Sequence, residues 1–193
     1  YKVYAYELTV RTSFLDEQHG YVNGASMFVY VPQLMNQPAT LTVKPAPGWN
    51  VVSTALKPVS GQLFTYEATN YDLLVDSPIE IGNHRVLQFT SSGGIPHQIA
   101  MFGETQYNEQ RLLADYKRVT EAATAVVGEH PCENYLFIVH HLPTGGGGLE
   151  HLNSTSLQTS RNAYVTEAGY TGFMGLVAHE YFHLWNVKRI RPK

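Results

Sequence analysis

Two histidines and a glutamate near the carboxyl end of the sequence have the spacing of a metal-dependent hydrolytic site. The stretch reads His179-Glu180-Tyr181-Phe182-His183. Histidines four residues apart lie on one face of a helix, so their imidazole nitrogens can converge on one metal ion. Glu180 would flank that metal without ligating it, where a carboxylate can take a proton from water. The pattern is typical of zinc peptidases and predicts a Zn²⁺ cofactor.

The residues around this motif favour a buried helix. Phe173, Leu176 and Val177 are apolar, and Thr171 is a candidate N-cap. Pro192 is expected to end the helix that follows the motif. The alternative is a pair of surface histidines on an ordinary amphipathic helix. A glycine run followed by a glutamate, at residues 145–150, favours the metal site.

A run of four glycines, residues 145–148, precedes a second candidate residue, Glu150. The run could be a flexible hairpin loop, but it lacks the Lys and Ser or Thr of a phosphate-binding loop. Glycine also lets another backbone approach closely, and an edge strand beside it can pair with an extended peptide. By itself Glu150 is expected to be a solvated surface carboxylate. Beside a zinc helix, the same carboxylate could hold the protonated amine of a peptide.

Composition describes a globular protein. The 193 residues are 44% hydrophobic and 15% charged, enough for one large or two small domains. A net charge of −3 gives no reason to expect binding to nucleic acid or to a membrane surface. No apolar run approaches the roughly 18 residues that a membrane-spanning helix needs. The single cysteine, Cys132, excludes an internal disulfide. We expect the protein to be located in the cytoplasm rather than in the periplasm.

Short segments with strand character fill the first half of the chain. We expect strands at residues 3–11, 26–31, 41–43, 51–56, 62–68, 85–91 and 96–102. Pro, Gly and Asn separate these segments, and Ser92-Gly93-Gly94 predicts a hairpin connection. Many short strands with regular turn signals predict an antiparallel, β-sandwich-like domain over residues 1–102.

The period changes from strand to helix near Gly103. Apolar residues recur at helical spacing over residues 105–127, and Gly128 is placed to end that helix. A continuous apolar run at residues 135–139 predicts a buried strand that leads to the glycine run. Polar alternation at residues 154–160 predicts an exposed edge strand. Residues 103–193 are therefore predicted as a second domain, and the fold class as α+β.

Three stretches together resemble the glycyl aminopeptidases, metallopeptidases that often carry a PDZ domain. They are residues 75–82, the run Gly146-Gly147-Gly148-Leu149-Glu150-His151, and residues 179–192, and the similarity extends over nearly the whole chain. This family is similar to the gluzincin aminopeptidases. The likeness implies a partial, β-sandwich-like N-terminal domain followed by the start of a thermolysin-like zinc peptidase domain.

The resemblance also assigns roles to individual residues. His179 and His183 would bind zinc, and Glu180 would be the general base. Glu150 would hold the free amine of a peptide substrate, while Gly147 and Gly148 would line the substrate strand. The implied function is removal of N-terminal residues from peptides, with glycine preferred. The competing interpretation is a non-catalytic module that binds peptides.

The chain departs from the family pattern at the third zinc ligand. Family members supply it as a Glu in a Trp-x-x-Glu-Gly-type stretch downstream of the motif. None of the ten residues after His183 is Glu, Asp or His. We therefore expect this chain to be a fragment of a longer enzyme. The fragment alone is expected to be inactive and to bind zinc weakly, and its Trp185 is expected to be exposed. His151 stands where the broader clan has an asparagine.

Overall fold

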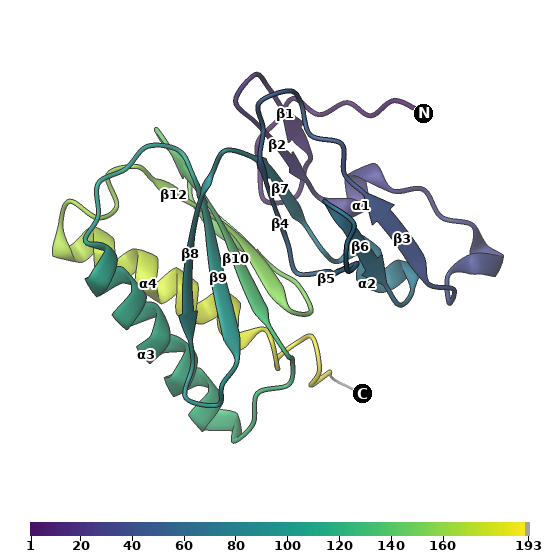
Figure 1. The fold of residues 1–193 in the computed structure, drawn as a ribbon. Helices are drawn as coiled ribbons and strands as arrows, with labels where there is room; N and C mark the ends of the chain where they lie inside the picture. The colour runs from purple at the N-terminus through teal and green to yellow at the C-terminus, as the bar shows by residue number, and fades with distance from the viewer. Residues whose placement is uncertain (192–193) are drawn as a thin grey trace. The chain divides into compact units, whose positions relative to one another are not determined.

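The computed structural model describes residues 1–191 and divides into two compact units, of which the first ends at His84 and the second begins at Arg85 (Figure 1). We placed the domain boundary at residue 102, so the compact units divide earlier than that prediction. Pro192, which we expected to end the helix after the motif, lies outside the described residues.

The first unit contains two antiparallel sheets. One has the strand order β1-β2-β7-β4, with β1 at Phe14–Leu15, β2 at His19–Val22, β7 at Ile79–Gly82 and β4 at Val51–Thr54. The other has the order β3-β6-β5, with β3 at Ala39–Thr42, β6 at Thr65–Ala68 and β5 at Lys57–Pro58. Every pairing within them is antiparallel, which confirms the predicted antiparallel β architecture.

Both sheets of the first unit contribute to its core. Leu56, Tyr66 and Ala68 are buried and pack against Val52 of β4 and Leu41 of β3. Three short helical segments connect the strands: α1 (Gly24–Met27), η1 (Pro32–Leu34) and α2 (Tyr71–Val75). Neither α2 nor β7 was expected from the sequence.

Two expected strands of the first unit are wrong. Residues 3–11 form only an isolated bridge, between Tyr6 and Phe14, and the Tyr6 side chain is exposed. Alternating side chains make a strand only where another strand supplies the hydrogen bonds. Residues 26–31 start inside α1, where the Asn23 side chain accepts a hydrogen bond from the Ala25 N–H and caps the helix. The rest of that segment is extended, and Tyr30 is exposed.

The second unit is a five-stranded mixed sheet with two helices on one face (Figure 1). Its strand order is β11-β12-β10-β9-β8, with β8 at Arg85–Thr90, β9 at Pro96–Phe102, β10 at Tyr135–Leu142, β11 at Gly147–Glu150 and β12 at Ser154–Ser160. The central strand β10 is parallel to β9 and β12, whereas β8–β9 and β11–β12 are antiparallel. Helices α3 (Glu109–Val127) and α4 (Glu167–Phe182) complete the unit.

The predicted β8, β9, α3 and β10 are confirmed. Asn108 caps the start of α3, and Gly128 ends it in the left-handed conformation at φ 99°. Side chains from both helices and from the sheet meet in one core, among them Tyr116, Phe137 and Val177. Because β8 and β9 pair into this sheet, they belong with the helices rather than with the first unit.

The edge strands of this sheet are β11 and β8, and the prediction of an exposed edge strand at residues 154–160 is wrong. Strand β12 lies between β11 and β10, and its residues from Ser154 to Thr159 are buried. Hydroxyl side chains can be buried in a sheet when they find acceptors nearby, as the Thr155 hydroxyl does with the Leu149 carbonyl at 3.0 Å. The glycine run is therefore partly strand, because Gly147 opens β11.

Helix α4 begins earlier than expected. Thr166 caps it, because its hydroxyl accepts a hydrogen bond from the Gly169 N–H at 3.1 Å. Thr171, the predicted cap, lies exposed within the second turn. The glycines of the first turns weaken the local helical signal, and packing against the core overrides that weakness.

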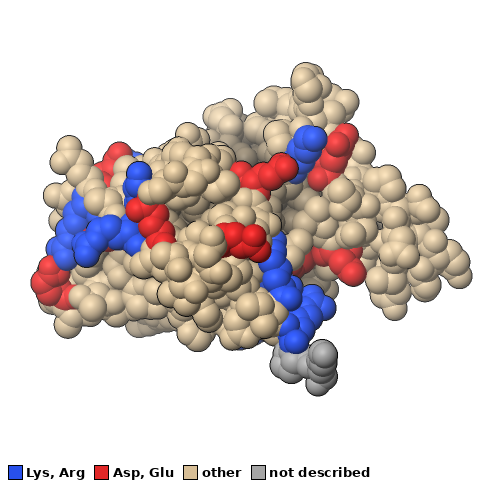
Figure 2. Space-filling model, turned by 90° about the horizontal axis from the view of Figure 1, so that it is seen from below, with Lys and Arg blue, Asp and Glu red and all other residues tan. Residues whose placement is uncertain are grey.

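Charged side chains of both signs are mixed on the surface. On the face shown in Figure 2, Lys and Arg lie beside Asp and Glu, and most of the face is uncharged. Within residues 1–191, none of the helices combines the length and the apolar character needed to cross a membrane.

Candidate metal centre

The two motif histidines converge at the carboxyl end of α4. His179 lies in the last turn and His183 is the C-cap. Their Nε2 atoms are 3.2 Å apart. Two nitrogen ligands of a tetrahedral zinc, each about 2.0–2.1 Å from the ion, lie roughly 3.3–3.4 Å apart. The spacing of these imidazoles therefore fits one zinc ion.

A backbone carbonyl fixes the orientation of His183. The Nδ1 atom lies 2.6 Å from the Asn186 carbonyl oxygen. A carbonyl can only accept, so Nδ1 carries the hydrogen and Nε2 presents its lone pair to the site. Metal-binding histidines are commonly oriented in this way. The contribution of Asn186 comes from its backbone, so no side-chain pattern could have indicated it.

Two carboxylates accompany the histidines. Glu180 is buried on α4, and Glu150 is half-buried on β11. Glu150, Glu180 and His183 each offer a ligand atom within 4.8 Å of the others. Imidazole nitrogens with carboxylate oxygens are a donor set that zinc accepts. The position of Glu150 agrees with the interpretation that placed it beside the motif helix rather than in bulk solvent.

The glycines predicted to line the substrate sit on the same edge strand. Gly147 adopts φ 115°, a conformation that favours glycine. Gly148 lies directly against the Glu180 side chain. His151 is buried just beyond β11, and its backbone N–H donates to the Ser154 carbonyl at 2.9 Å. The structure thus brings together every predicted site residue, while their roles stay predictions.

Behind the motif, Tyr181 is fixed by two histidines that the sequence did not single out. Its hydroxyl lies 2.9 Å from Nε2 of His97 on β9 and 2.7 Å from Nε2 of His130 in the α3–β10 connection. Burial lowers the pKa of His97 to about 4 and also lowers the pKa of His130. Burial raises the pKa of Tyr181, so the phenol stays protonated at neutral pH. The neighbouring Phe182, by contrast, is partly exposed.

The segment after the motif is packed against the second unit, and the predicted exposure of Trp185 is wrong. Trp185 is buried, and its Nε1 donates to the Glu129 carbonyl at 3.1 Å. Nη1 of Arg189 donates to the carbonyls of Leu152, at 2.9 Å, and Leu184, at 2.7 Å. A guanidinium can bind several carbonyls at once, so Arg189 ties the post-motif turn to the loop after β11.

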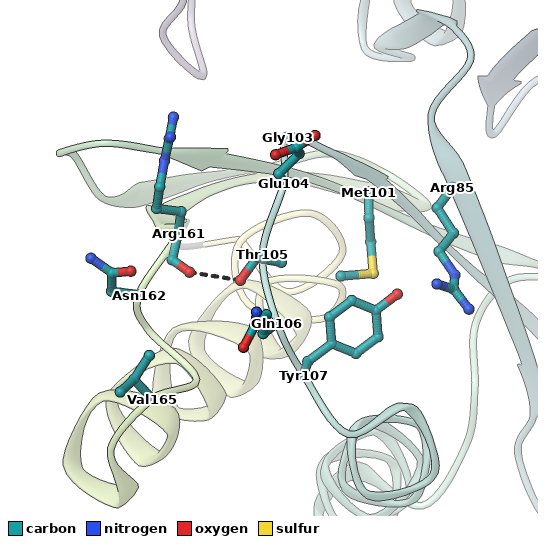
Figure 3. A pocket seen from close by; sticks show the side chains of 10 residues that line it. All are labelled: Arg85, Met101, Gly103, Glu104, Thr105, Gln106, Tyr107, Arg161, Asn162 and Val165. Carbon is teal, nitrogen blue, oxygen red and sulfur yellow. Dashed lines mark hydrogen bonds between the residues drawn. The ribbon is translucent and has the colours of Figure 1, made fainter.

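One cavity of the second unit is formed by other residues. It measures about 690 Å³, is lined by the segments that follow β9 and β12, and includes Arg85, Tyr107 and Arg161 (Figure 3). The Thr105 hydroxyl donates to the Arg161 carbonyl at its wall. None of the predicted site residues lines this cavity.

Two sequence profiles of a single peptidase family match the chain. One, described as the peptidase M61 N-terminal domain, matches residues 1–83, and the other, described as M61 glycyl aminopeptidase, matches residues 172–193. Together they cover more than half of the sequence and include the whole motif. The chain belongs to the M61 glycyl aminopeptidase family. The resemblance inferred from the sequence is therefore confirmed.

A solved structure has the same fold over nearly the whole chain. The chain is similar to a crystal structure of an aminopeptidase N family protein from Idiomarina loihiensis, at 33% sequence identity and a TM-score of 0.92. The match covers 98% of this chain and 34% of that chain, so the M61 chain spans about a third of its length. No curated protein matches the chain.

Proposed function

We propose that the full-length M61 protein is a zinc aminopeptidase that removes N-terminal residues, preferably glycine, from peptides. The observation that carries this proposal is the convergence of His179, His183, Glu180 and Glu150 on one small volume at the edge of the sheet. A binding module would have no use for a buried carboxylate beside two metal-competent imidazoles.

His179 and His183 would hold the metal through Nε2. A bound zinc ion supplies Lewis acidity, which polarises a carbonyl oxygen and lowers the pKa of a water molecule towards about 7. Glu180 then accepts a proton from the attacking water and passes it to the leaving amine. Its burial keeps bulk solvent away from that carboxylate, which strengthens its interactions with charge at the reacting centre.

Glu150 would select peptides with a free amino terminus. A carboxylate that meets an ammonium group forms a charge-assisted hydrogen bond, worth about 1.5–3 kcal/mol. The open edge of β11 can pair with the backbone of an extended peptide, so the substrate would be bound by main-chain hydrogen bonds. Recognition would therefore depend on the end of the peptide more than on its interior sequence.

The test uses the full-length protein loaded with zinc. Glu180→Gln should abolish hydrolysis of a glycyl anilide while about one zinc per chain is retained by atomic absorption. Glu150→Ala should lower kcat/KM for free-amine peptides by about 10- to 150-fold and leave binding of amine-blocked peptides unchanged. Zinc-free protein that still binds peptides would support the non-catalytic module instead. Equal losses for blocked and free peptides would assign Glu150 to the structure or to the metal.

A further inference from the structure

Gly148 and Glu180 occupy a space that allows only one side chain. A Cβ atom built on Gly148 would lie 2.3 Å from both Cδ and Oε1 of Glu180 and 2.4 Å from its Cγ. Non-bonded carbons in contact are about 3.5–4.0 Å apart. The Glu180 carboxylate therefore fills the volume that any other residue at position 148 would need.

The neighbouring glycines have other surroundings. A Cβ on Gly146 would meet nothing closer than the Gln158 carbonyl oxygen at 3.9 Å, which is ordinary contact. A Cβ on Gly147 would meet nothing within 4 Å, but its φ of 115° disfavours other residues. Position 148 has no such backbone demand. The requirement for glycine at position 148 thus comes from the Glu180 side chain.

We propose that Gly148 is a positioning residue for Glu180, in addition to any contact that it makes with substrate. The backbones on both sides of the clash are fixed. Gly148 is paired with Leu157 in the β11–β12 ladder, and Glu180 stands on a helix packed into the core. A methyl group at position 148 would therefore displace the end of the Glu180 side chain rather than either backbone.

This displacement would act on the catalytic step more than on binding. The inference rests on the proposed role of Glu180 as general base. Misplacement of a reacting group by about 1 Å can cost on the order of 100-fold in rate. Gly148→Ala should thus lower kcat by about 100-fold, with KM changed by less than about threefold. Gly146→Ala, the matched control from the same glycine run, should keep wild-type kcat.

A thermal-unfolding cycle tests the contact without any need for activity. In full-length protein, Gly148→Ala should lower Tm by about 2–4 °C, as expected when a methyl group overpacks a buried side chain. In a Glu180→Ala background the same change should leave Tm unaltered, because the clashing atoms are gone. Gly146→Ala should leave Tm unaltered in both backgrounds.

The outcomes separate this inference from the proposed function. An equal Tm loss in both backgrounds, or none in either, would overturn the positioning role. Coupling in Tm with no peptidase activity in the wild type would support the contact and refute the aminopeptidase.

Discussion

Removal of the buried Tyr181 hydroxyl should destabilise the packing of the motif helix α4. The Tyr181 side chain is fully buried, and its hydroxyl contacts Nε2 of both His97 and His130. Tyr181→Phe keeps the ring and deletes those contacts. His97 is itself fully buried, so its Nε2 would lose its partner without gaining water. Nδ1 of each histidine donates to a backbone carbonyl, so both Nε2 atoms are acceptors and the single Tyr181 O–H donates to only one of them at a time. The loss of that donor leaves a buried acceptor unsatisfied, at a cost of about 1–3 kcal/mol.

The chain offers a matched control in the same core. Tyr135 is equally buried, with its ring centroid 4.7 Å from that of Tyr181. Among the described residues its hydroxyl has no hydrogen-bond partner. Tyr135→Phe therefore removes a buried polar group that gains nothing, and should be neutral or stabilising by up to about 1 kcal/mol. The two substitutions delete the same atom and should differ by about 1–4 kcal/mol in the free energy of unfolding.

Urea unfolding followed by tryptophan fluorescence measures this difference. Trp185 is buried 5.8 Å from the Tyr181 ring, centroid to centroid, and a Trp49→Phe background makes it the sole tryptophan of these 193 residues. The free energy of unfolding should fall by about 1–3 kcal/mol for Tyr181→Phe, with an unchanged dependence on urea. Equal values for the two Tyr→Phe variants would refute the reasoning that hydrogen bonds, and not the ring alone, fix this helix.

Three further outcomes are expected, two of them pH-dependent. Burial lowers the pKa of His97 and His141 to about 4. As pH falls from 6.5 to 4, these two imidazoles therefore become protonated in the unfolded chain but stay neutral in the folded one. Stability of the second unit should then fall as pH falls, by up to about 1.4 kcal/mol per pH unit for each group, and a flat urea-unfolding profile would contradict this. In the first unit, burial raises the pKa of Glu80 to about 7, so the folded unit keeps a proton that the unfolded chain loses above pH 4.5. Stability there should fall as pH rises from about 4.5 to 7, and Glu80→Gln should abolish that slope. Finally, Arg189→Lys should destabilise the second unit by about 1–3 kcal/mol, because one ammonium cannot replace a guanidinium on several carbonyls. The exposed Arg191→Lys is its control and should change nothing in the same measurement.

The sequence predicted best the elements whose periodicity is long or uninterrupted. The helical spacing before Gly128 and the apolar run of β10 gave α3 and β10 with nearly correct bounds. The strand predicted at residues 3–11 is absent because alternating apolar and polar side chains show only that a strand there would have one apolar face. A strand also needs a neighbouring strand to supply its backbone hydrogen bonds. The prediction that β12 is an exposed edge strand failed for a different reason. Its serines and threonines look exposed in sequence, yet hydroxyls of this size can be buried once they are hydrogen-bonded.

The candidate site shows the same division between local and distant information. The spacing of His179 and His183 was enough to predict that their imidazoles would meet. Glu150 was expected at the surface from the residues alone, and only the resemblance to the glycyl aminopeptidases placed it beside them. The partners of Tyr181 were not predictable. His97 and His130 lie 84 and 51 residues away along the chain, and nothing in their own neighbourhoods distinguishes them from the other histidines of the chain.

The end of α4 at Phe182 has an electrostatic consequence for the site. Peptide dipoles aligned along a helix add up to about half a negative charge at its carboxyl end, where the last carbonyls lack helical partners. His179 stands in the last turn and His183 caps it, so a cation held by both rests at this negative pole. Such placement typically favours a positive charge by about 0.3–1 kcal/mol at a surface and more when the site is partly buried. The same pair of histidines in the first turn would face the positive pole, which attracts anions and repels metal ions. The helix that brings the imidazoles together therefore also makes their meeting point attractive to a cation.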